Sequence, residues 1–161
     1  MSKITDDFDS ILDAAETQAR DDVELDVFLG DKLVTFAFIQ LPGADYAELI
    51  AKNPPRTYER PGADGKPEQI IARVDKSIGF NANGVAAGYS VDFIRRVVDG
   101  KRLPVTQEQW DRVIARFTGR DLELAGTVIW GINFFTPNER VKAAKKALEA
   151  PSETEQSSPE S

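Results

Sequence analysis

The sequence predicts an α+β fold in which an N-terminal β-hairpin packs against a mainly helical C-terminal bundle. Three observations predict it: apolar residues alternate over 23–29, caps and helical apolar spacing follow residue 105, and 161 residues with 41% hydrophobic content suit one core. We expect a single domain over 22–150, an acidic helical arm over 1–21 before it and a disordered acidic tail over 151–161 after it.

The hairpin prediction depends on strand patterns on both sides of a turn. Every second residue from Val23 to Leu29 is apolar, which is typical of a half-buried strand. Gly30-Asp31 supplies a turn, and residues 32–40 are rich in valine, phenylalanine and isoleucine. A hairpin over 22–40 follows, and Pro42-Gly43 ends it.

The middle of the chain gives a weaker pattern. A helix is predicted over 44–53, with Tyr46, Leu49 and Ile50 on one face and Pro54-Pro55 as its stop. Residues 54–69 are interpreted as a mobile polar loop.

Beyond this loop the sequence indicates three further segments. Ile70, Ile71 and Val74 are predicted to be buried, and residues 81–89 to form a helix. Residues 91–98 fit a helix or a strand, and Asp99-Gly100 ends that segment in either case.

The last third is predicted to be helical. Thr106 and Gln109 form a capping box before an apolar stripe (Trp110, Val113, Ile114 and Phe117), and Gly119 is expected to close that helix. A second helix is expected over 120–133. A second capping box at 136–139 predicts a third helix, with an inward-facing stripe of Val141, Ala144 and Leu148.

The first residues predict an amphipathic helix over about 5–18, docked on the body or on a partner. Thr5 can cap it, and its apolar positions have helical spacing: Ile4, Phe8, Ile11, Leu12 and Ala15. Residues 1–26 carry a net charge of −7 and residues 151–161 carry −3, so residues 27–150 carry about +3. Both acidic ends are interpreted first as aids to solubility, and the mildly basic body as able to dock acidic partners.

Composition argues against catalysis, so we predict a protein that is not an enzyme and needs no cofactor or metal. Cysteine and histidine are absent, which removes thiolate chemistry and the commonest general base and metal ligand. The carboxylate pairs Asp121–Glu123 and Glu108–Asp111 are expected to face solvent, whereas an acid–base pair needs one desolvated member. The glycine-rich fragment Gly79–Gly84 lacks the lysine of a phosphate loop.

Neither a membrane nor a nucleic acid is predicted as a partner. The start does not resemble a signal peptide, and the longest nearly apolar run, 124–135, is about half of the roughly 20 residues that a membrane helix needs. The tight basic cluster of Arg95, Arg96, Lys101 and Arg102 matches no nucleic-acid motif. A solvated patch is the favoured interpretation, and a dock for an acidic protein segment is the next.

The helix over 120–133 is apolar on two faces, so we expect both faces to be buried against other residues. One face carries Leu122, Ala125, Ile129 and Ile132, and aromatic bulk lies at the end of the helix. Such a helix is central in a core, which is favoured, or is covered by a second copy or a client. In the second case the predicted partner-binding residues are Trp130, Phe134, Phe135, Leu124 and Val128.

Four segments of 23–137 occur in a distinctive order. They are the strand that leads into Leu41-Pro42, the helix closed by Asn53-Pro54-Pro55, the helix start at Glu108–Asp111, and the link Phe117–Asp121 into the helix containing Ile129–Asn133. This order resembles the tail assembly chaperones of long-tailed phages, particularly phages of actinobacterial hosts. Residues 76–103 and the long acidic arm depart from that pattern.

The resemblance implies a late phage protein whose copies coat the long, hydrophobic tape measure protein until tail-tube subunits polymerise around it. Its expected partners are that client and a second copy or a longer form made by ribosomal frameshifting, and its expected location is the host cytoplasm, outside the mature virion. The alternative is a structural minor tail or connector subunit, which would be present in purified particles.

Overall fold

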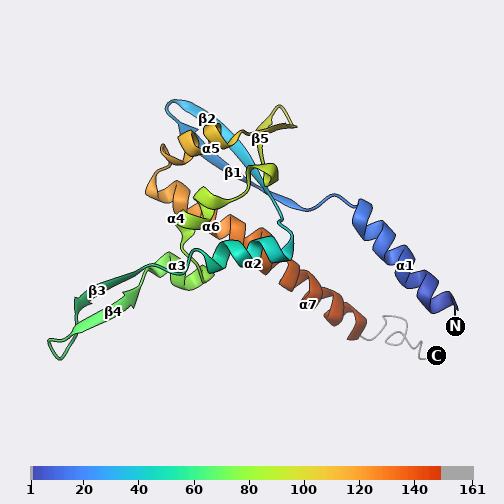
Figure 1. Cartoon of the computed structure of the whole chain (residues 1–161), viewed down its shortest axis with the longest axis horizontal. Coiled ribbons are helices and arrows are strands. Elements are labelled where there is room, and N and C mark those ends of the chain that lie inside the picture. Colours follow the sequence, from blue (N-terminus) through green and yellow to red (C-terminus); the bar gives the residue numbers. More distant parts are fainter. Residues whose placement is uncertain (1, 150–161) are drawn as a thin grey trace, which may run out of the picture.

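The computed structural model describes residues 2–149, with side chains from residue 7 onward, so the predicted disordered tail lies outside the described residues. Its body is a mixed α+β fold, which confirms the predicted fold class. A four-stranded antiparallel sheet lies against a layer of helices, while one small hairpin and two helices project from the body (Figure 1).

The sheet has the order β1-β2-β5-β6, and each neighbouring pair is antiparallel. Its first two strands are the predicted hairpin, β1 (Asp22–Leu29) and β2 (Lys32–Ile39). The segment that the sequence left open between helix and strand becomes a short 3₁₀ turn, η1 (Val91–Phe93), followed by β5 (Ile94–Val98). A tight turn leads from there to β6 (Lys101–Pro104).

Both tight turns of the sheet need residues that tolerate positive φ. Gly30 has φ 63° between β1 and β2, while Asp99 and Gly100 have φ 49° and 76° between β5 and β6. Aspartate and glycine are the residue types that favour such turns. The Asp99-Gly100 step therefore does more than end a segment, because it returns the chain into the sheet as a fourth strand.

Three helices cover the inner face of the sheet: α4 (Ala82–Gly88), α5 (Gln107–Ile114) and α6 (Gly119–Trp130). Behind them, α2 (Gly43–Ala51) packs against α4, and α3 (Arg73–Ile78) packs against α4 and α6. The buried core lies between the two layers and includes Leu25, Val27, Phe36, Phe38, Ile94, Val85, Ala86, Trp110, Ala125 and Ile129. α4 and α6 pack so closely that a Cβ on Gly126 would lie 2.6 Å from the Cβ of Ala82.

Trp110 joins the sheet to the helices at the centre of this core. Its ring is fully buried and packs edge-on against Phe36 and Phe38 of β2, with centroids 5.3 and 5.7 Å away. Its indole N–H donates a 3.0 Å hydrogen bond to the carbonyl of Ala86 in α4. One side chain thus supplies apolar contact and satisfies a buried carbonyl.

The prediction of a loop over 54–69 is wrong. This segment forms a second hairpin, β3 (Thr57–Pro61) and β4 (Pro67–Ile71), which projects from the body (Figure 1). Proline and glycine misled the sequence argument, because prolines here stand at strand ends, where a missing N–H costs little. Ile71 is exposed rather than buried, since this hairpin has no helical layer against it.

The base of this hairpin is held by a buried carboxylate that the sequence did not reveal. Asp75 of α3 is fully buried and accepts two hydrogen bonds from the Arg56 guanidinium, at 2.8 and 2.9 Å. It also accepts from the backbone N–H groups of Arg56 and Ala82, at 2.8 and 3.1 Å. Burial alone would raise the pKa of Asp75, but these bonds favour the anion and lower the pKa to about 2.

A second carboxylate was misplaced by the sequence argument, which put Asp121 on a solvent-facing position. Asp121 is buried and completes a capping box with Thr118 at the start of α6. Gly119 accordingly is the first residue of α6 and does not close the preceding helix. The predicted capping box of Thr106 and Gln109 at the start of α5 is confirmed.

We expect Asp75→Asn to weaken folding and to remove part of its acid sensitivity. The folded-state pKa of Asp75 lies below its unfolded value of 3.8, so its contribution is present above pH 4 and is lost as the pH falls toward 2. The contribution is about 2 kcal/mol. Urea unfolding at several pH values from 7 to 2 measures this contribution as the difference in free energy of unfolding between the unaltered protein and the variant. A difference that stays constant over this pH range would contradict the prediction.

Candidate partner-binding site

The helix that carries the predicted partner-binding residues does not end where the sequence suggested. α6 continues through a π-helical turn, η2 (Gly131–Phe135), directly into α7 (Thr136–Glu149). Thr136 has helical dihedrals (φ −62°, ψ −47°), so it cannot act as the predicted N-cap of a new helix. The second capping box is therefore wrong.

Pro137 is accommodated by the wider turn. The N–H of Thr136 reaches back five residues to the carbonyl of Gly131, and Pro137 has no N–H for the carbonyl of Ile132. The side-chain amide of Gln40, at the end of β2, donates to that carbonyl over 3.3 Å. A side chain from the sheet thus supplies the donor that proline lacks.

Asn133 ties the same turn to the sheet. Its Oδ1 accepts from the N–H of Leu41 at 2.8 Å, and its Nδ2 donates to the Tyr89 hydroxyl at 3.0 Å. The Tyr89 hydroxyl donates in turn to the carbonyl of Ile39 at 2.6 Å. Burial raises the pKa of Tyr89, so its proton stays in place for this bond.

This turn brings three of the five predicted partner-binding residues together. The ring of Trp130 stacks on Phe135, with centroids 5.1 Å apart, and on Phe134, with centroids 6.4 Å apart. Phe134 is 54% exposed and Phe135 is 46% exposed, whereas Trp130 is half-buried against the core. We call these three residues the aromatic stack.

The other two predicted residues lie elsewhere on the helix. Leu124 and Val128 stand six and two residues before Trp130, which places them about 120° and 160° around the helix axis from it. Leu124 is exposed and Val128 packs partly against the core. The face of Ala125, Ile129 and Ile132 is buried, as the core interpretation predicts.

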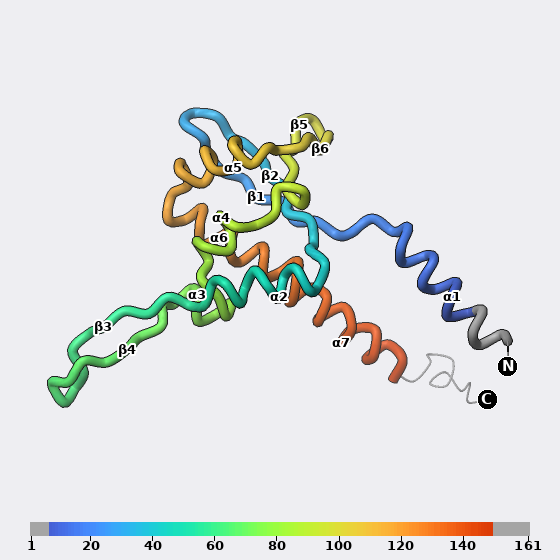
Figure 2. The backbone as a smooth tube through the Cα atoms, viewed as in Figure 1, coloured from blue at the N-terminus to red at the C-terminus, as the bar shows by residue number. Residues whose placement is uncertain are grey.

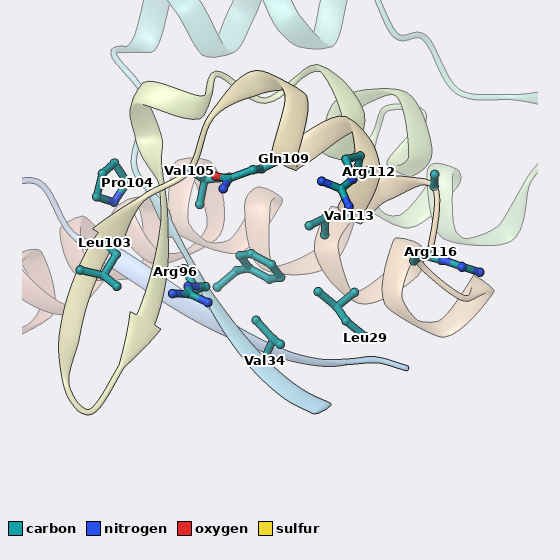
Figure 3. Close-up of a pocket in the computed structure, with 12 residues that line it drawn as sticks. Leu29, Val34, Arg96, Leu103, Pro104, Val105, Gln109, Arg112, Val113 and Arg116 are labelled. Carbon is teal, nitrogen blue, oxygen red and sulfur yellow. The ribbon is translucent and has the colours of Figure 1, made fainter. Parts of the chain in front are cut away.

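A groove beside α5 is a second apolar surface, which no pattern in the sequence indicated. It encloses about 980 Å³ between the inner face of the sheet and α5 (Figure 3). Its apolar lining comes from β1, β2, β6, α5 and the segment that joins the last two: Leu29, Val34, Phe36, Leu103, Val105 and Val113. We call it the α5 groove.

Three arginines surround this apolar lining. Arg96 comes from β5, Arg112 from α5 and Arg116 from the turn that follows α5 (Figure 3). All three are exposed, and no acidic side chain among residues 7–149 forms an ion pair with them. The surface therefore suits a segment that carries both apolar and acidic side chains.

The groove could not be found from local patterns, because its lining comes from elements far apart in the sequence. The basic cluster gave a partial signal, but the structure divides it. Arg96 lies in the groove, whereas Arg102 pairs with Asp22 and Glu24 of β1, at 2.6 and 3.4 Å. The guanidinium of Arg95 donates to two backbone carbonyls.

The two buried carboxylates of the described chain support the fold. Asp75 and Asp121 are its two buried charged residues, and the pKa of each is lowered although burial alone would raise it. A general acid at neutral pH needs a raised pKa instead. Across residues 7–149, whose side chains the structure describes, no three acidic side chains gather as a metal site would need.

Within that part of the chain, no helix is both long enough and apolar enough to cross a membrane. Comparison of the chain with protein-family models, with curated proteins and with solved structures gave no match.

Stability measurements should separate the exposed rings from the core face of the same helix. Phe134→Ala is expected to change the free energy of unfolding by less than about 1 kcal/mol, because the ring is half-exposed at a surface. Ile129→Ala, on the buried face, should cost about 2–5 kcal/mol. Urea unfolding of both variants tests this, and similar costs would place the aromatic stack in the core.

Proposed function

We propose that this protein is a non-catalytic binding protein that holds an apolar polypeptide in solution, and that it is a tail assembly chaperone of a tape measure protein. The observation that carries the proposal is the aromatic stack. Phe134 and Phe135 stand exposed on a helix fixed to the sheet by the hydrogen bonds of Gln40 and Asn133. Rigidly held, exposed aromatic rings are typical anchors of protein–protein contacts.

The resemblance to tail assembly chaperones supports the identity of the client. Its last two segments fall on the start of α5, on the capping box of α6 and on the beginning of the π turn. These elements carry the groove wall and the aromatic stack. Two of the four segments that resemble the family therefore lie on elements that present apolar surface.

The physical properties of the surfaces suit reversible holding. Covering about 100 Å² of apolar surface contributes roughly 2.5 kcal/mol before the cost of ordering the client. An aromatic stack and a groove give each copy two modest contacts, and several copies along one client add their contacts through effective concentration. A client held in this way can still be released when tail-tube subunits compete for it.

Co-expression with the tape measure protein should move that client from the insoluble to the soluble fraction. Phe134→Asp/Phe135→Asp should abolish most of this effect, because the charges prevent apolar contact at the aromatic stack. The control is Tyr58→Asp on the β3–β4 hairpin, where the ring is 53% exposed and distant in the sequence from the aromatic stack.

The measurement is the fraction of client in the supernatant, with the melting temperature of each variant recorded first. An insoluble client in the presence of the unaltered protein would end the chaperone proposal. Full solubilisation of the client by the double variant would show that the aromatic stack does not bind the client.

The arginines of the α5 groove should make client binding depend on salt. Arg112→Glu/Arg116→Glu is expected to weaken the binding of acidic, apolar client peptides about tenfold at low salt and to remove most of the salt dependence. The matched control is Arg73→Glu/Lys76→Glu, which reverses two exposed charges on α3. Fluorescence anisotropy of labelled client peptides tests this, and equal losses in both variants would contradict a role for the groove.

A further inference from the structure

Two helices, α1 (Ser2–Thr17) and α7, leave the body on the same side (Figure 2), and both carry exposed apolar side chains. In α1, Ile11 is 63% exposed, and Phe8 and Leu12 are also exposed. In α7, Val141 is 57% and Leu148 is 87% exposed, so the predicted inward-facing stripe of this helix is wrong. Val141 and Ala144 line an open cavity beside Asp21 and Gln40, and Leu148 lies one turn farther out, which explains the error.

We propose that the apolar stripe of α7 is a docking surface for an acidic amphipathic helix, and that its occupant is α1 of the same chain. The pairing concerns this chain alone and does not depend on the client. Its first support is position. Ala15 and Glu16 of α1 line one cavity of about 490 Å³ together with Arg140 of α7, so the ends of the two helices that adjoin the body are neighbours.

The direction of the chain makes the pair antiparallel. α1 runs toward the body and ends at Thr17, and α7 begins at Thr136 beside the sheet and runs away from it (Figure 1). Residues 18–21 join α1 to β1 without helix or strand. A change of backbone dihedrals in this short connection is sufficient to swing α1 toward α7.

The two apolar stripes match in this antiparallel register. Going away from the body, the stripe of α1 is Ala15, Leu12 and Phe8, with steps of three and four residues. The stripe of α7 is Val141, Ala144 and Leu148, with the same steps in the same order. Ala15 would lie beside Val141, Leu12 beside Ala144 and Phe8 beside Leu148. Matching three- and four-residue steps are the condition for two helices to interdigitate along a seam.

The charges beside the stripes are also complementary. On α1, Glu16 and Asp9 lie about 70° and 90° around the axis from the centre of the stripe, and on α7, Lys145 and Lys142 lie about 70° and 130° from it in the same rotational sense. These are the flanks that face each other in an antiparallel pair, so acidic residues meet basic ones. Lys142 already pairs with Glu139, but that pair is exposed and easily exchanged.

Disulfide trapping tests the register, because the chain contains no cysteine of its own. Leu12→Cys/Ala144→Cys should form an intramolecular disulfide under mild oxidation. The control is Leu12→Cys/Lys146→Cys, which places the second thiol on the opposite side of α7 and should oxidise at least about tenfold more slowly. Non-reducing electrophoresis and mass spectrometry separate the closed monomer from cross-linked dimers.

Charge reversal tests the flanks in the same trapping assay. Asp9→Lys/Glu16→Lys should slow closure about tenfold, and adding Lys142→Glu/Lys145→Glu should restore it. Equal rates for the two cysteine pairs, or no rescue by the second reversal, would overturn the pairing. Disulfide-linked dimers in place of the closed monomer would overturn the intramolecular form, because they would assign α1 to a second copy. Loss of client solubilisation leaves these readouts unchanged, so the two proposals fail separately.

Discussion

The packing of Trp110 between β2 and α4 decides how far the inner face of the sheet is covered. Trp110 is the fully buried side chain of α5 that packs against the sheet, and the helix ends one turn later, at Ile114. The strands extend beyond that point, so Leu29 and Val34 remain only half-buried at the edge of the core. The α5 groove is therefore a direct result of a helix that is shorter than the strands it covers.

A second constraint follows from Pro137, which removes one donor from a helix that runs on from α6 into α7. The protein keeps the helix continuous by widening one turn, and Gln40 and Asn133 connect that turn to the sheet. The wider turn changes the side on which the next residues emerge, so that two phenylalanines stack on Trp130 at the surface. The same π turn thus accommodates Pro137 in the helix and places the aromatic stack at the surface.

Local signals in the sequence were sufficient for the fold class, the first hairpin and the capping box at Thr106. Each of these depends on residues close together in the chain, such as the alternation from Val23 to Leu29. The errors have a common cause, which is that tertiary partners determine the outcome. Thr136 is a residue type that favours N-caps, but the helix continues through it because the Gln40 amide donates to the carbonyl of Ile132.

The candidate site was predictable only in part for the same reason. The sequence indicated the aromatic residues at the end of α6, but the turn that stacks them depends on bonds to the sheet. Asp75 gave no signal, because its burial depends on an arginine 19 residues away. The α5 groove could be predicted only by knowing the order of all four strands in the sheet. Of these strands, β5 lies in the segment 91–98, which fitted a helix or a strand, and β6 follows it.

The hydrogen bonds between the Arg56 guanidinium and Asp75 fix the base of the β3–β4 hairpin, and the hairpin beyond this point projects away from the core. The tip of that hairpin, residues 62–66, is a local turn in which the N–H of Gly62 donates to the carbonyl of Lys66. Foreign peptide inserted into this turn would leave the Asp75–Arg56 hydrogen bonds and the core around Trp110 untouched. The turn is therefore the natural place to graft an affinity tag or a fluorescent reporter.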